Sequence, residues 1–205
     1  MNSKADMIRE IKEVYNLHSP KILSILEKIP REEFVLDRFK HLAYEDTALS
    51  ISEGQTISQP FTVAFMTQLL DLKGNEKVLE VGTGSGYQAA ILASLTKEVF
   101  TIERIEKLAE RARKIFKKLR IKNIHTKVGQ GEKGWKEESL FDAIIITANT
   151  KKVPKKLFEQ LKTDGRLVAP IGKGTQGIMT KYIKNKDKIV KQEYGSFSFV
   201  PLITS

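Results

Sequence analysis

The hydrophobic residues of this chain change their spacing near Phe61, and the change divides the sequence into two regions. Ahead of it, apolar side chains recur at helical spacing in two segments: Ile8, Ile11 and Tyr15, then Ile22, Leu23, Leu26 and Ile29. Ser19-Pro20 is typical of a helix start, and Pro30 is typical of a helix end. Residues 1–60 are therefore predicted to form a helical and irregular extension.

From Phe61 onward, short apolar segments alternate with amphipathic ones. One helical face is formed by Phe61, Phe65, Met66, Leu69 and Leu72. Buried strands are then predicted at residues 78–81, 99–103, 124–128, 143–147 and 166–170, with helices at 86–96, 105–119 and 154–161. Short units of this kind are typical of a parallel sheet with helices on both faces.

The C-terminal segment has a different pattern. Residues 178–184 and 189–194 flank a polar turn, which predicts a hairpin, and the stretch 197–202 predicts a final strand. We therefore predict an α/β fold: a mostly parallel, twisted sheet with helices on both faces, an antiparallel C-terminal strand and the N-terminal helical extension.

The composition fits one domain without a membrane segment or a metal centre. At 205 residues and 40% apolar content the chain can bury one substantial core, so residues 1–205 are predicted to form a single domain with 61–205 as its core. The longest apolar run, 143–148, is too short to cross a bilayer, and no signal peptide is apparent. The chain has no cysteine, which excludes disulfides and thiolate chemistry and is typical of a cytoplasmic protein. Its three histidines are widely spaced, so no metal site is predicted.

The formal net charge of +10 raises the question of a nucleic-acid partner. The basic residues are widely spread, however, and clusters such as Arg111-Ala-Arg113-Lys114 fall at helical spacing among apolar positions. A solvated helix face accounts for this arrangement, so nucleic acid is not favoured as a partner. A positive field would equally attract substrates that carry carboxylates.

The most informative segment for chemistry is "VLEVGTGSGYQAA", a predicted strand followed by a triple-glycine turn and a helix. Gly82, Gly84 and Gly86 permit positive φ and let a ligand approach the backbone without a Cβ in the way. In an open α/β sheet this first crossover lies at the carboxyl edge, where ligands bind.

Two interpretations of this loop compete. Gly84-x-Gly86-x-x-Ala89 satisfies the dinucleotide pattern, in which a pyrophosphate meets the helix N-terminus. Glu80, inside the strand, instead favours a cationic amine such as that of S-adenosylmethionine, which carries no phosphate. Glu80 could also be an ordinary salt-bridge partner at the strand end, because burying it unpaired would be costly.

A second acidic residue, Glu103, ends the next predicted strand. Its distance from the glycine loop suits an acceptor for two ribose hydroxyls, although it could instead cap the following helix. The loop Gly129-Gln130-Gly131 after the third strand is a candidate for contact with an adenine, or a bare turn.

Together these residues resemble the protein-L-isoaspartate (D-aspartate) O-methyltransferase family, from about Ile29 to Thr204. The resemblance is carried by "IPREEFVLDRFKHLAYEDTALSI", "GQTISQP", "VLEVGTGSGYQAAILA", "FDAIIITA", "LKTDGRLVAPIG" and "FVPL". The glycine loop alone indicates only the Rossmann-like class I S-adenosylmethionine-dependent methyltransferase fold. Its combination with "GQTIS" and "FVPL" is much more specific.

The resemblance implies transfer of a methyl group from S-adenosyl-L-methionine to the free α-carboxyl group of L-isoaspartyl residues in damaged proteins and peptides, with D-aspartyl residues as a further candidate. S-adenosyl-L-homocysteine is left, and the ester promotes succinimide formation and return to L-aspartate. The extension 1–60 is expected to contribute to the substrate site, with Ser58 as the catalytic residue. The expected cofactor-binding residues are Gln55, Thr56, Ser58, Glu80, Gly82, Thr83, Gly84, Gly86, Glu103, Arg104, Gln130 and Gly131.

A site without a general base suits this reaction, because a carboxylate is already a nucleophile at neutral pH. The remaining task is alignment of the reacting atoms and exclusion of water. Ser58 lies just before Pro60 at a predicted helix start, where unpaired N–H groups favour an anion. Its hydroxyl can hold the carboxylate or simply cap the helix, and these roles do not exclude each other.

Three features depart from the family pattern. Gln130 stands where an acidic residue is usual, residues 149–152 replace small residues and proline, and Ser52-Glu53-Gly54 replaces glycine-tyrosine-glycine. Two alternative functions also stay open: a class I methyltransferase acting on RNA or another small carboxylate, and a non-catalytic nucleotide-binding module. The sequence lacks the aromatic motif that methyltransferases use on base amino groups, and Glu80 and Glu103 would repel phosphate.

Overall fold

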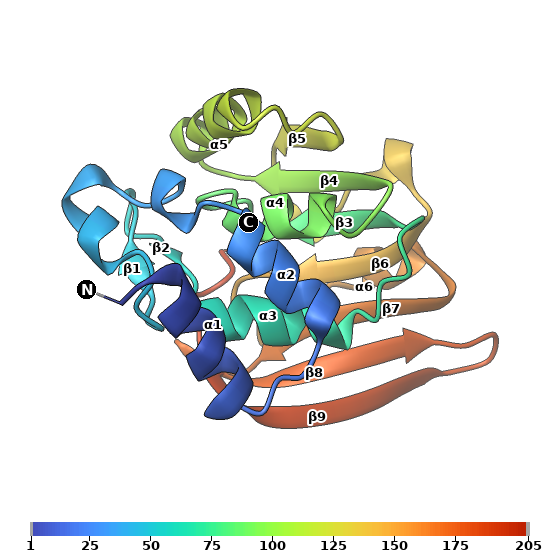
Figure 1. The fold of residues 1–205 in the computed structure, drawn as a ribbon. Helices are drawn as coiled ribbons and strands as arrows, with labels where there is room; N and C mark the ends of the chain where they lie inside the picture. The colour runs from blue at the N-terminus through green and yellow to red at the C-terminus, as the bar shows by residue number, and fades with distance from the viewer. Residues whose placement is uncertain (1, 204–205) are drawn as a thin grey trace.

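Seven strands within residues 2–203, the part of the chain that the computed structural model describes, form one mixed sheet (Figure 1). They are β3 (Lys77–Val81), β4 (Glu98–Glu103), β5 (Ile124–Val128), β6 (Phe141–Ile146), β7 (Leu161–Ile171), β8 (Gln176–Lys184) and β9 (Ile189–Ser198). The order is β5-β4-β3-β6-β7-β8-β9; the first five run parallel, and β8 and β9 are antiparallel to their neighbours. Met1, Thr204 and Ser205, which the predicted domain includes, lie outside the described residues.

Helices cover both faces of this sheet. They are α1 (Lys4–Glu13), α2 (Pro20–Lys28), α3 (Pro60–Leu69), α4 (Tyr87–Ala93), α5 (Glu106–Lys118) and α6 (Lys155–Glu159). Successive side chains of β3 point to opposite faces: Val78 belongs to the apolar cluster of α3, α4 and α5, whereas Leu79 belongs to the cluster of α6. Because both faces are covered, β3 and β6 are buried almost throughout; β6 is apolar except for Asp142, whereas β3 also buries Glu80.

The C-terminal end of the sheet differs in one respect from the prediction. The hairpin is confirmed as β8 and β9, but the separate strand predicted at 197–202 is wrong. β9 continues to Ser198, and the chain then leaves it to lie beside Asn149 at the end of β6. The Asn149 N–H donates to the Val200 carbonyl (2.8 Å), and the Leu202 N–H donates to the Asn149 carbonyl (2.7 Å). Pro201 between them has no N–H and cannot extend a ladder.

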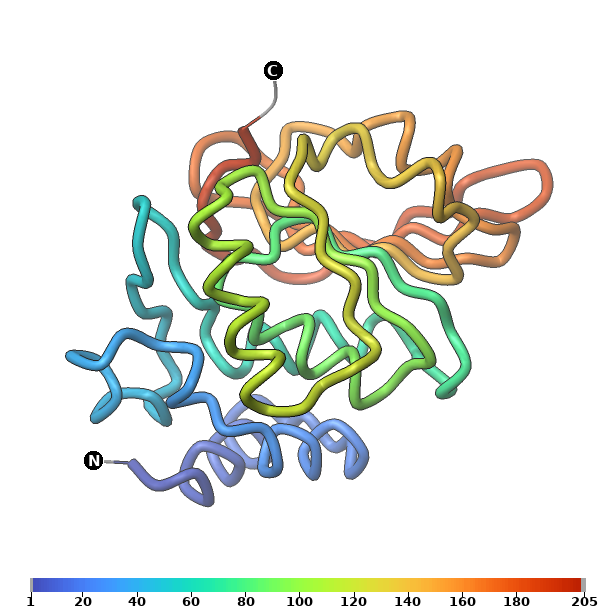
Figure 2. The backbone as a smooth tube through the Cα atoms, turned by 90° about the horizontal axis from the view of Figure 1, so that it is seen from above, coloured from blue at the N-terminus to red at the C-terminus, as the bar shows by residue number. Residues whose placement is uncertain are grey.

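The N-terminal extension forms an additional layer outside α3. Both α1 and α2 pack against each other and against α3, and Figure 2 shows them in blue on the outer side of the helical layer. Because α3 has the sheet on one side and these helices on the other, it is buried on nearly every side rather than on the single face predicted for it.

The rest of the extension is irregular and returns to the carboxyl edge of the sheet. It consists of 3₁₀ helices at Arg31–Glu33 and Asp37–Leu42 and a two-stranded sheet of β1 (Leu49–Ser50) and β2 (Thr56–Ile57); two further 3₁₀ helices follow β5, at Gly131–Lys133 and Lys136–Glu138. The β1–β2 hairpin contains most of the "GQTISQP" segment.

Two arginines fix the irregular part of the extension to the core. Arg31 is fully buried, and its guanidinium donates to the carbonyls of Ala43 (2.8 Å) and Thr47 (3.1 Å) and lies 5.1 Å from the ring centre of Tyr87. Arg111 on α5 donates to two further carbonyls of the extension, at 3.2 and 2.7 Å. Burying a guanidinium is costly, and Nη1 of Arg31 has no partner within residues 2–203, so the hydrogen bonds that Arg31 does make strongly specify how this segment folds.

We expect the extension and the core to unfold together. Phe34 is fully buried and packs edge-on against Tyr87 at 5.4 Å, so Phe34→Ala should lower the free energy of unfolding by about 3–5 kcal/mol in urea. The control Val14→Ala, at a side chain that is 71% exposed, should change it by less than about 0.5 kcal/mol. Two separate unfolding transitions in the wild type would contradict the predicted single domain.

Candidate active site

The glycine loop between β3 and α4 has a left-handed backbone at three positions. The φ angles of Gly82, Gly84 and Gly86 are +100°, +53° and +89°, which side chains rarely tolerate. A Cβ at Gly82 would lie 2.5 Å from the Thr147 hydroxyl, and one at Gly86 would lie 2.8 Å from the ring of Phe116. At Gly84 the nearest atoms would be 4.0 Å away, so this position faces open space.

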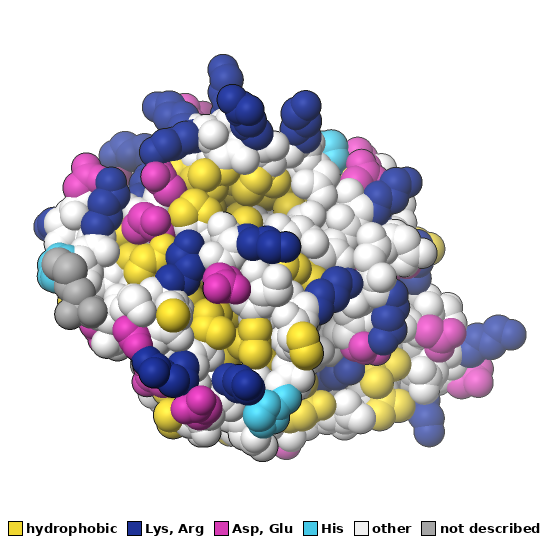
Figure 3. All heavy atoms as spheres, in the orientation of Figure 1, with side chains coloured by type: hydrophobic (Ala, Val, Ile, Leu, Met, Phe, Trp, Pro, Cys, Tyr) yellow, Lys and Arg dark blue, Asp and Glu magenta, His cyan; other side chains and the backbone are white. Residues whose placement is uncertain are grey.

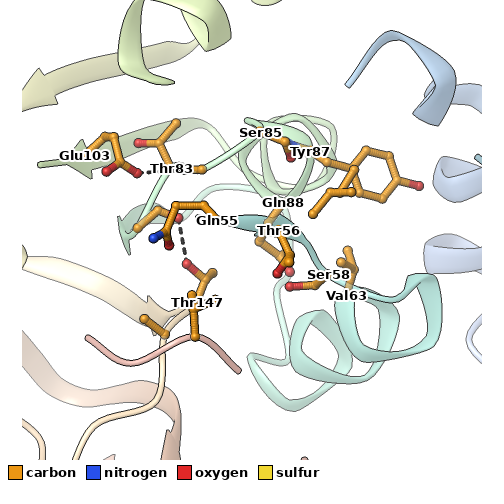
Figure 4. Close-up of a pocket in the computed structure, with 15 residues that line it drawn as sticks. Gln55, Thr56, Ser58, Val63, Thr83, Ser85, Tyr87, Gln88, Glu103 and Thr147 are labelled. Carbon is orange, nitrogen blue, oxygen red and sulfur yellow. Dashed lines mark hydrogen bonds between the residues drawn. The ribbon is translucent and has the colours of Figure 1, made fainter. Parts of the chain in front are cut away.

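The open space belongs to two adjoining cavities at the carboxyl edge of the sheet, shown in part in Figure 4. The first, which we call the central cavity, is lined by Gln55, Thr56, Ile57, Ser58, Val63, Gly82, Thr83, Gly84, Ser85, Tyr87, Gln88, Glu103, Thr147, Ala148 and Val200. The second, the distal cavity, is lined by Gln55, Val81, Gly82, Ile102, Glu103, Arg104, Ile105, Gly131, Ala148, Pro201, Leu202 and Ile203. Gln55, Gly82, Glu103 and Ala148 line both, so the two cavities form one elongated site.

A third hollow adjoins the central cavity on the side away from Glu103. This hollow, which we call the aromatic groove, is lined by Tyr15, Ala48, Thr56, Ser58, Gln59, Phe61, Thr62, Phe65, Thr147 and residues 195–200. Ser58 and Thr147 line both the groove and the central cavity. In Figure 4, Ser58 and Glu103 lie at opposite ends of the central cavity, so Ser58 stands where the two spaces meet.

Glu103 fixes the shape of the glycine loop and remains able to accept further hydrogen bonds. One carboxylate oxygen accepts from the Gly84 N–H (2.9 Å), and the other accepts from the Ile105 N–H at the start of α5 (2.9 Å). The helix-capping role considered for Glu103 is therefore confirmed in part. A carboxylate has about four acceptor positions, so two remain for hydroxyl donors in the cavity.

Glu80 lies beneath the cavity wall and does not line it. Its side chain is fully buried, and one oxygen accepts from the Thr101 hydroxyl (2.5 Å), which is 2.6 Å from the hydroxyl of the cavity-lining Thr83. Its other oxygen, Oε1, has no donor among residues 2–203. Burial, with a smaller contribution from the charge of Glu103, raises the pKa of Glu80 to about 8. The salt bridge considered for Glu80 is not formed within this part of the chain, because one oxygen accepts from the Thr101 hydroxyl and the other has no partner.

The N-terminus of α3 is capped by Asp46 and not by Ser58. One Asp46 oxygen accepts from the Phe61 N–H (2.8 Å), and the other accepts from the Gln59 side-chain amide (2.5 Å). The anion expected at this helix start is thus supplied by the extension itself. Within residues 2–203 the half-buried Ser58 hydroxyl has no hydrogen bond, so the capping role considered for it is wrong. Its O–H stays available at the junction of cavity and groove.

The structure brings together nine of the twelve expected cofactor-binding residues: Gln55, Thr56, Ser58, Gly82, Thr83, Gly84, Glu103, Arg104 and Gly131 all line the central or the distal cavity. Three do not line it. Glu80 lies beneath the wall, Gly86 packs against α5, and Gln130 is exposed outside the distal cavity.

The sequence pattern missed Thr147. Its hydroxyl donates to the carbonyl of Gly82 (2.6 Å), and its position after β6 puts it beside the glycine loop. A polar residue directly after an apolar strand that neighbours the glycine-loop strand is the signal that would have found it.

Within residues 2–203 no group of three or more acidic, histidine or cysteine side chains is placed to hold a metal ion. The same residues contain no helix that is long and apolar enough to cross a membrane.

Basic side chains are spread over the surface with acidic and apolar ones between them. On the face in Figure 3 they project most densely at the top, over α5, and occur singly elsewhere. Lys and Arg positions on α5 alternate with the buried stripe Leu108, Ala109, Ala112, Ile115 and Phe116, as expected for a solvated helix face. None of the described residues lining the central cavity or the aromatic groove is a lysine or an arginine.

Comparison with known proteins identifies similar chains. The family model described as Protein-L-isoaspartate(D-aspartate) O-methyltransferase (PCMT) matches residues 2–205. The protein-L-isoaspartate O-methyltransferase of Dictyoglomus turgidum is 48% identical over 199 residues, covering 97% of this chain and 90% of that relative. That of Trichlorobacter lovleyi is 50% identical over 186 residues, covering 90% and 86%.

Solved structures with the same overall fold include two proteins bearing this description. A protein-L-isoaspartate O-methyltransferase superposes with a TM-score of 0.88 at 28% identity, over 97% of this chain and 65% of that longer chain. A Plasmodium falciparum protein described in the same way, solved with S-adenosyl-L-homocysteine, superposes with a TM-score of 0.86 over 99% of both chains. At 24% identity the second likeness concerns the fold alone, and it agrees with the predicted α/β architecture.

The raised pKa of Glu80 predicts a pH-dependent stability. The folded protein holds the Glu80 proton up to about pH 8, whereas the unfolded chain releases it near the ordinary value of 4.5. The stability contributed by this group is therefore complete below pH 4.5 and lost as the pH rises through 8. Near pH 9, Glu80→Gln should be more stable than the wild type by on the order of 3 kcal/mol in urea without ligand, and near pH 5 this advantage should vanish. A difference that stays constant from pH 5 to 9 would contradict the burial of Glu80 as a neutral acid.

Proposed function

The chain belongs to the protein-L-isoaspartate(D-aspartate) O-methyltransferase family, and from this premise we propose how its site performs the family's reaction. It is a methyltransferase that uses S-adenosyl-L-methionine and acts on the free α-carboxyl group of L-isoaspartyl residues in damaged proteins and peptides. The observation that carries the assignment of roles is the position of Ser58. This hydroxyl, which has no hydrogen bond within residues 2–203, lies between a cavity that suits the cofactor and a groove open to a peptide.

The residues of the elongated site fit a cationic cofactor without phosphate. When bound, S-adenosyl-L-methionine supplies an electrophilic methyl group on a sulfonium. The free acceptor positions of Glu103 favour hydroxyl and cationic groups and would repel a pyrophosphate. Glu80 is a neutral acid in the ligand-free protein, and a cation bound near its Oε1, which has no donor among the described residues, would lower its pKa and ionise it. Gly84 leaves room at the wall for a ligand.

The position of each residue suggests its role. We assign the methionine part to the central cavity, where Thr83 and Gly84 form the wall and the Glu80 carboxylate acts from beneath. We assign Glu103 to the ribose and the distal cavity, with Arg104 and Gly131, to the adenine. Gln130 is exposed outside that cavity, so the replacement of the usual acidic residue by glutamine should have little effect on cofactor binding.

Ser58 is the residue we assign to the substrate carboxylate. Its hydroxyl donates to a carboxylate oxygen and holds it without neutralising the negative charge that makes it a nucleophile. Thr147 already uses its proton on the Gly82 carbonyl, which leaves the hydroxyls of Thr56 and Ser58 as donors that line both the cavity and the groove, and the family resemblance selects Ser58. The protein's contribution is orientation and exclusion of water, which can account for much of the rate.

The extension 1–60 is proposed to be part of the substrate site and not an independent unit. It supplies Gln55, Thr56 and Ser58 to the cavity walls, and Asp46 fixes the helix start beside them. We propose that damaged protein chains, not nucleic acid, are the partners, because the groove next to Ser58 has no basic lining among the described residues. The cytoplasmic location expected of a cysteine-free chain stays a prediction.

The activity is tested with methyl-labelled S-adenosyl-L-methionine and peptide pairs that differ only in containing isoaspartate or aspartate. Base-labile label should appear on the isoaspartyl peptide and not on the aspartyl peptide, because only the former presents a free α-carboxylate beside its extended backbone. A D-aspartyl peptide tests the further candidate substrate. Label on added RNA with none on either peptide would overturn the proposal in favour of an RNA methyltransferase.

Ser58→Ala should lower kcat for the isoaspartyl peptide by about 10²-fold, while the Kd for the cofactor changes by less than about threefold. The reason is that Ser58 lies at the far end of the cavity from Glu103 and holds the reacting carboxylate. Rapid-quench methyl transfer gives the first quantity and calorimetric titration with S-adenosyl-L-homocysteine gives the second. Ser94→Ala on the far side of α4, whose hydroxyl bonds to the Ala90 carbonyl, is the matched control. Equal losses in kcat and cofactor affinity would reduce Ser58 to a structural residue.

A further inference from the structure

Four rings that line the aromatic groove, together with Tyr194 behind Phe65, form a ladder drawn from three separate parts of the chain. Tyr15, which follows α1, stacks on Phe61 with centroids 3.9 Å apart and planes inclined by 11°. Phe61 continues to Phe65 (5.6 Å), and Phe65 meets Phe197 (5.5 Å) and Tyr194 (5.8 Å) of β9. Tyr15 closes one end of the ladder and is still 36% exposed, so its ring has a surface free for a further partner.

We propose that this ladder is a specificity subsite for the side chain that flanks the isoaspartyl residue, and that Tyr15 is its determining residue. The proposal rests on the proposed function, because the isoaspartyl carboxylate at Ser58 places the neighbouring residues of the peptide in the groove. Bulky apolar side chains, above all aromatic ones, are then preferred next to the damaged residue. Aromatic pairs contribute about 0.5–1.5 kcal/mol beyond the area they bury.

The charge of the groove supports an apolar rather than an ionic subsite. No described residue that lines it carries a formal charge, although the chain as a whole has a net charge of +10. The Tyr15 ring also remains neutral, because burial and the neighbouring Asp46 raise its pKa to about 12. A glutamate beside the isoaspartyl residue would therefore gain no ion pair from the lining of the groove and would lose hydration.

The position of Tyr15 is fixed by the same residues that fix the loop of Ser58. The Gln59 side-chain amide donates to the Tyr15 hydroxyl (3.2 Å) and to Asp46 (2.5 Å), and Asp46 also caps α3. Gln59 directly follows Ser58, so the hydrogen bonds of Gln59 and Asp46 hold both the Tyr15 ring and the Ser58 loop in place. A stable distance between them is what a subsite next to a reacting group requires.

The other wall of the groove suits an extended peptide. It is the end of β9, which is the edge strand of the sheet formed by residues 2–203 and has β8 as its strand partner there. Main-chain groups on the outer side of β9 can therefore pair with a substrate backbone, while alternate side chains of the substrate reach the rings.

The test uses two isoaspartyl peptides that differ only in carrying phenylalanine or glycine as the flanking residue, with each flank substituted in turn. For the wild type, kcat/KM should be about five- to tenfold higher with phenylalanine at one of the flanks, mainly through KM. In Tyr15→Ala this ratio should fall to near one, and Tyr15→Phe, which keeps the ring and loses the hydroxyl, should retain it. Val14→Ala is the matched control at the same helix end, because Val14 is 71% exposed and does not line the groove.

The outcomes separate this inference from the proposed function. If the wild type methylates both peptides with equal kcat/KM, or if Tyr15→Ala keeps the wild-type ratio, the subsite is overturned and the methyltransferase assignment stands. If the wild type methylates neither isoaspartyl peptide, both fail. Unchanged affinity of Tyr15→Ala for S-adenosyl-L-homocysteine shows that a lost ratio reports the groove and not a damaged fold, and Tyr15→Leu provides a second variant with an apolar side chain.

Discussion

The left-handed backbone of the glycine loop is the constraint on which the rest of the site depends. Gly82 lets the end of β6 approach closely enough for Thr147 to donate to its carbonyl, and Gly86 lets α4 pack against Phe116 of α5. Between them the Gly84 N–H is turned toward Glu103, which holds it at 2.9 Å. The three conformations together open the cavity at the edge where the parallel strands end. The topology of the sheet therefore sets the place at which a ligand can bind.

The N-terminal extension completes this site by supplying wall residues that the sheet does not contain. Asp46 caps α3 in place of a local residue, so the Ser58 hydroxyl does not cap the helix and makes no hydrogen bond within the described residues. Arg31 and Arg111 hold the same segment by hydrogen bonds to its carbonyls. The reaction needs no general base, and the extension accordingly contributes position rather than acid–base groups.

The parts of this picture that follow from local pattern were readable from the sequence. The apolar run 143–147 predicted β6 and the short stretch 78–81 predicted β3, and the glycines with Glu103 predicted a ligand site at the edge where the two cavities lie. The capping of α3 by Asp46 was not readable, because the two lie 15 residues apart and only tertiary folding brings them together. The depth of Glu80 and the turn of the chain away from the sheet after Ser198 are likewise set by packing and not by spacing.

The burial of Arg31 has a consequence for how the protein responds to heat. A guanidinium held by carbonyls and a ring face, with no ion pair to a carboxylate among the described residues, loses hydration that these contacts and the charge of Asp46 offset only in part. The hydration of ions becomes less favourable as temperature rises, so this cost shrinks on warming. The docking of the extension, and with it the loop of Ser58, therefore weakens less steeply with temperature than conformational entropy alone would dictate. The loop that carries Ser58 therefore stays in place toward the upper end of the temperature range in which the fold survives.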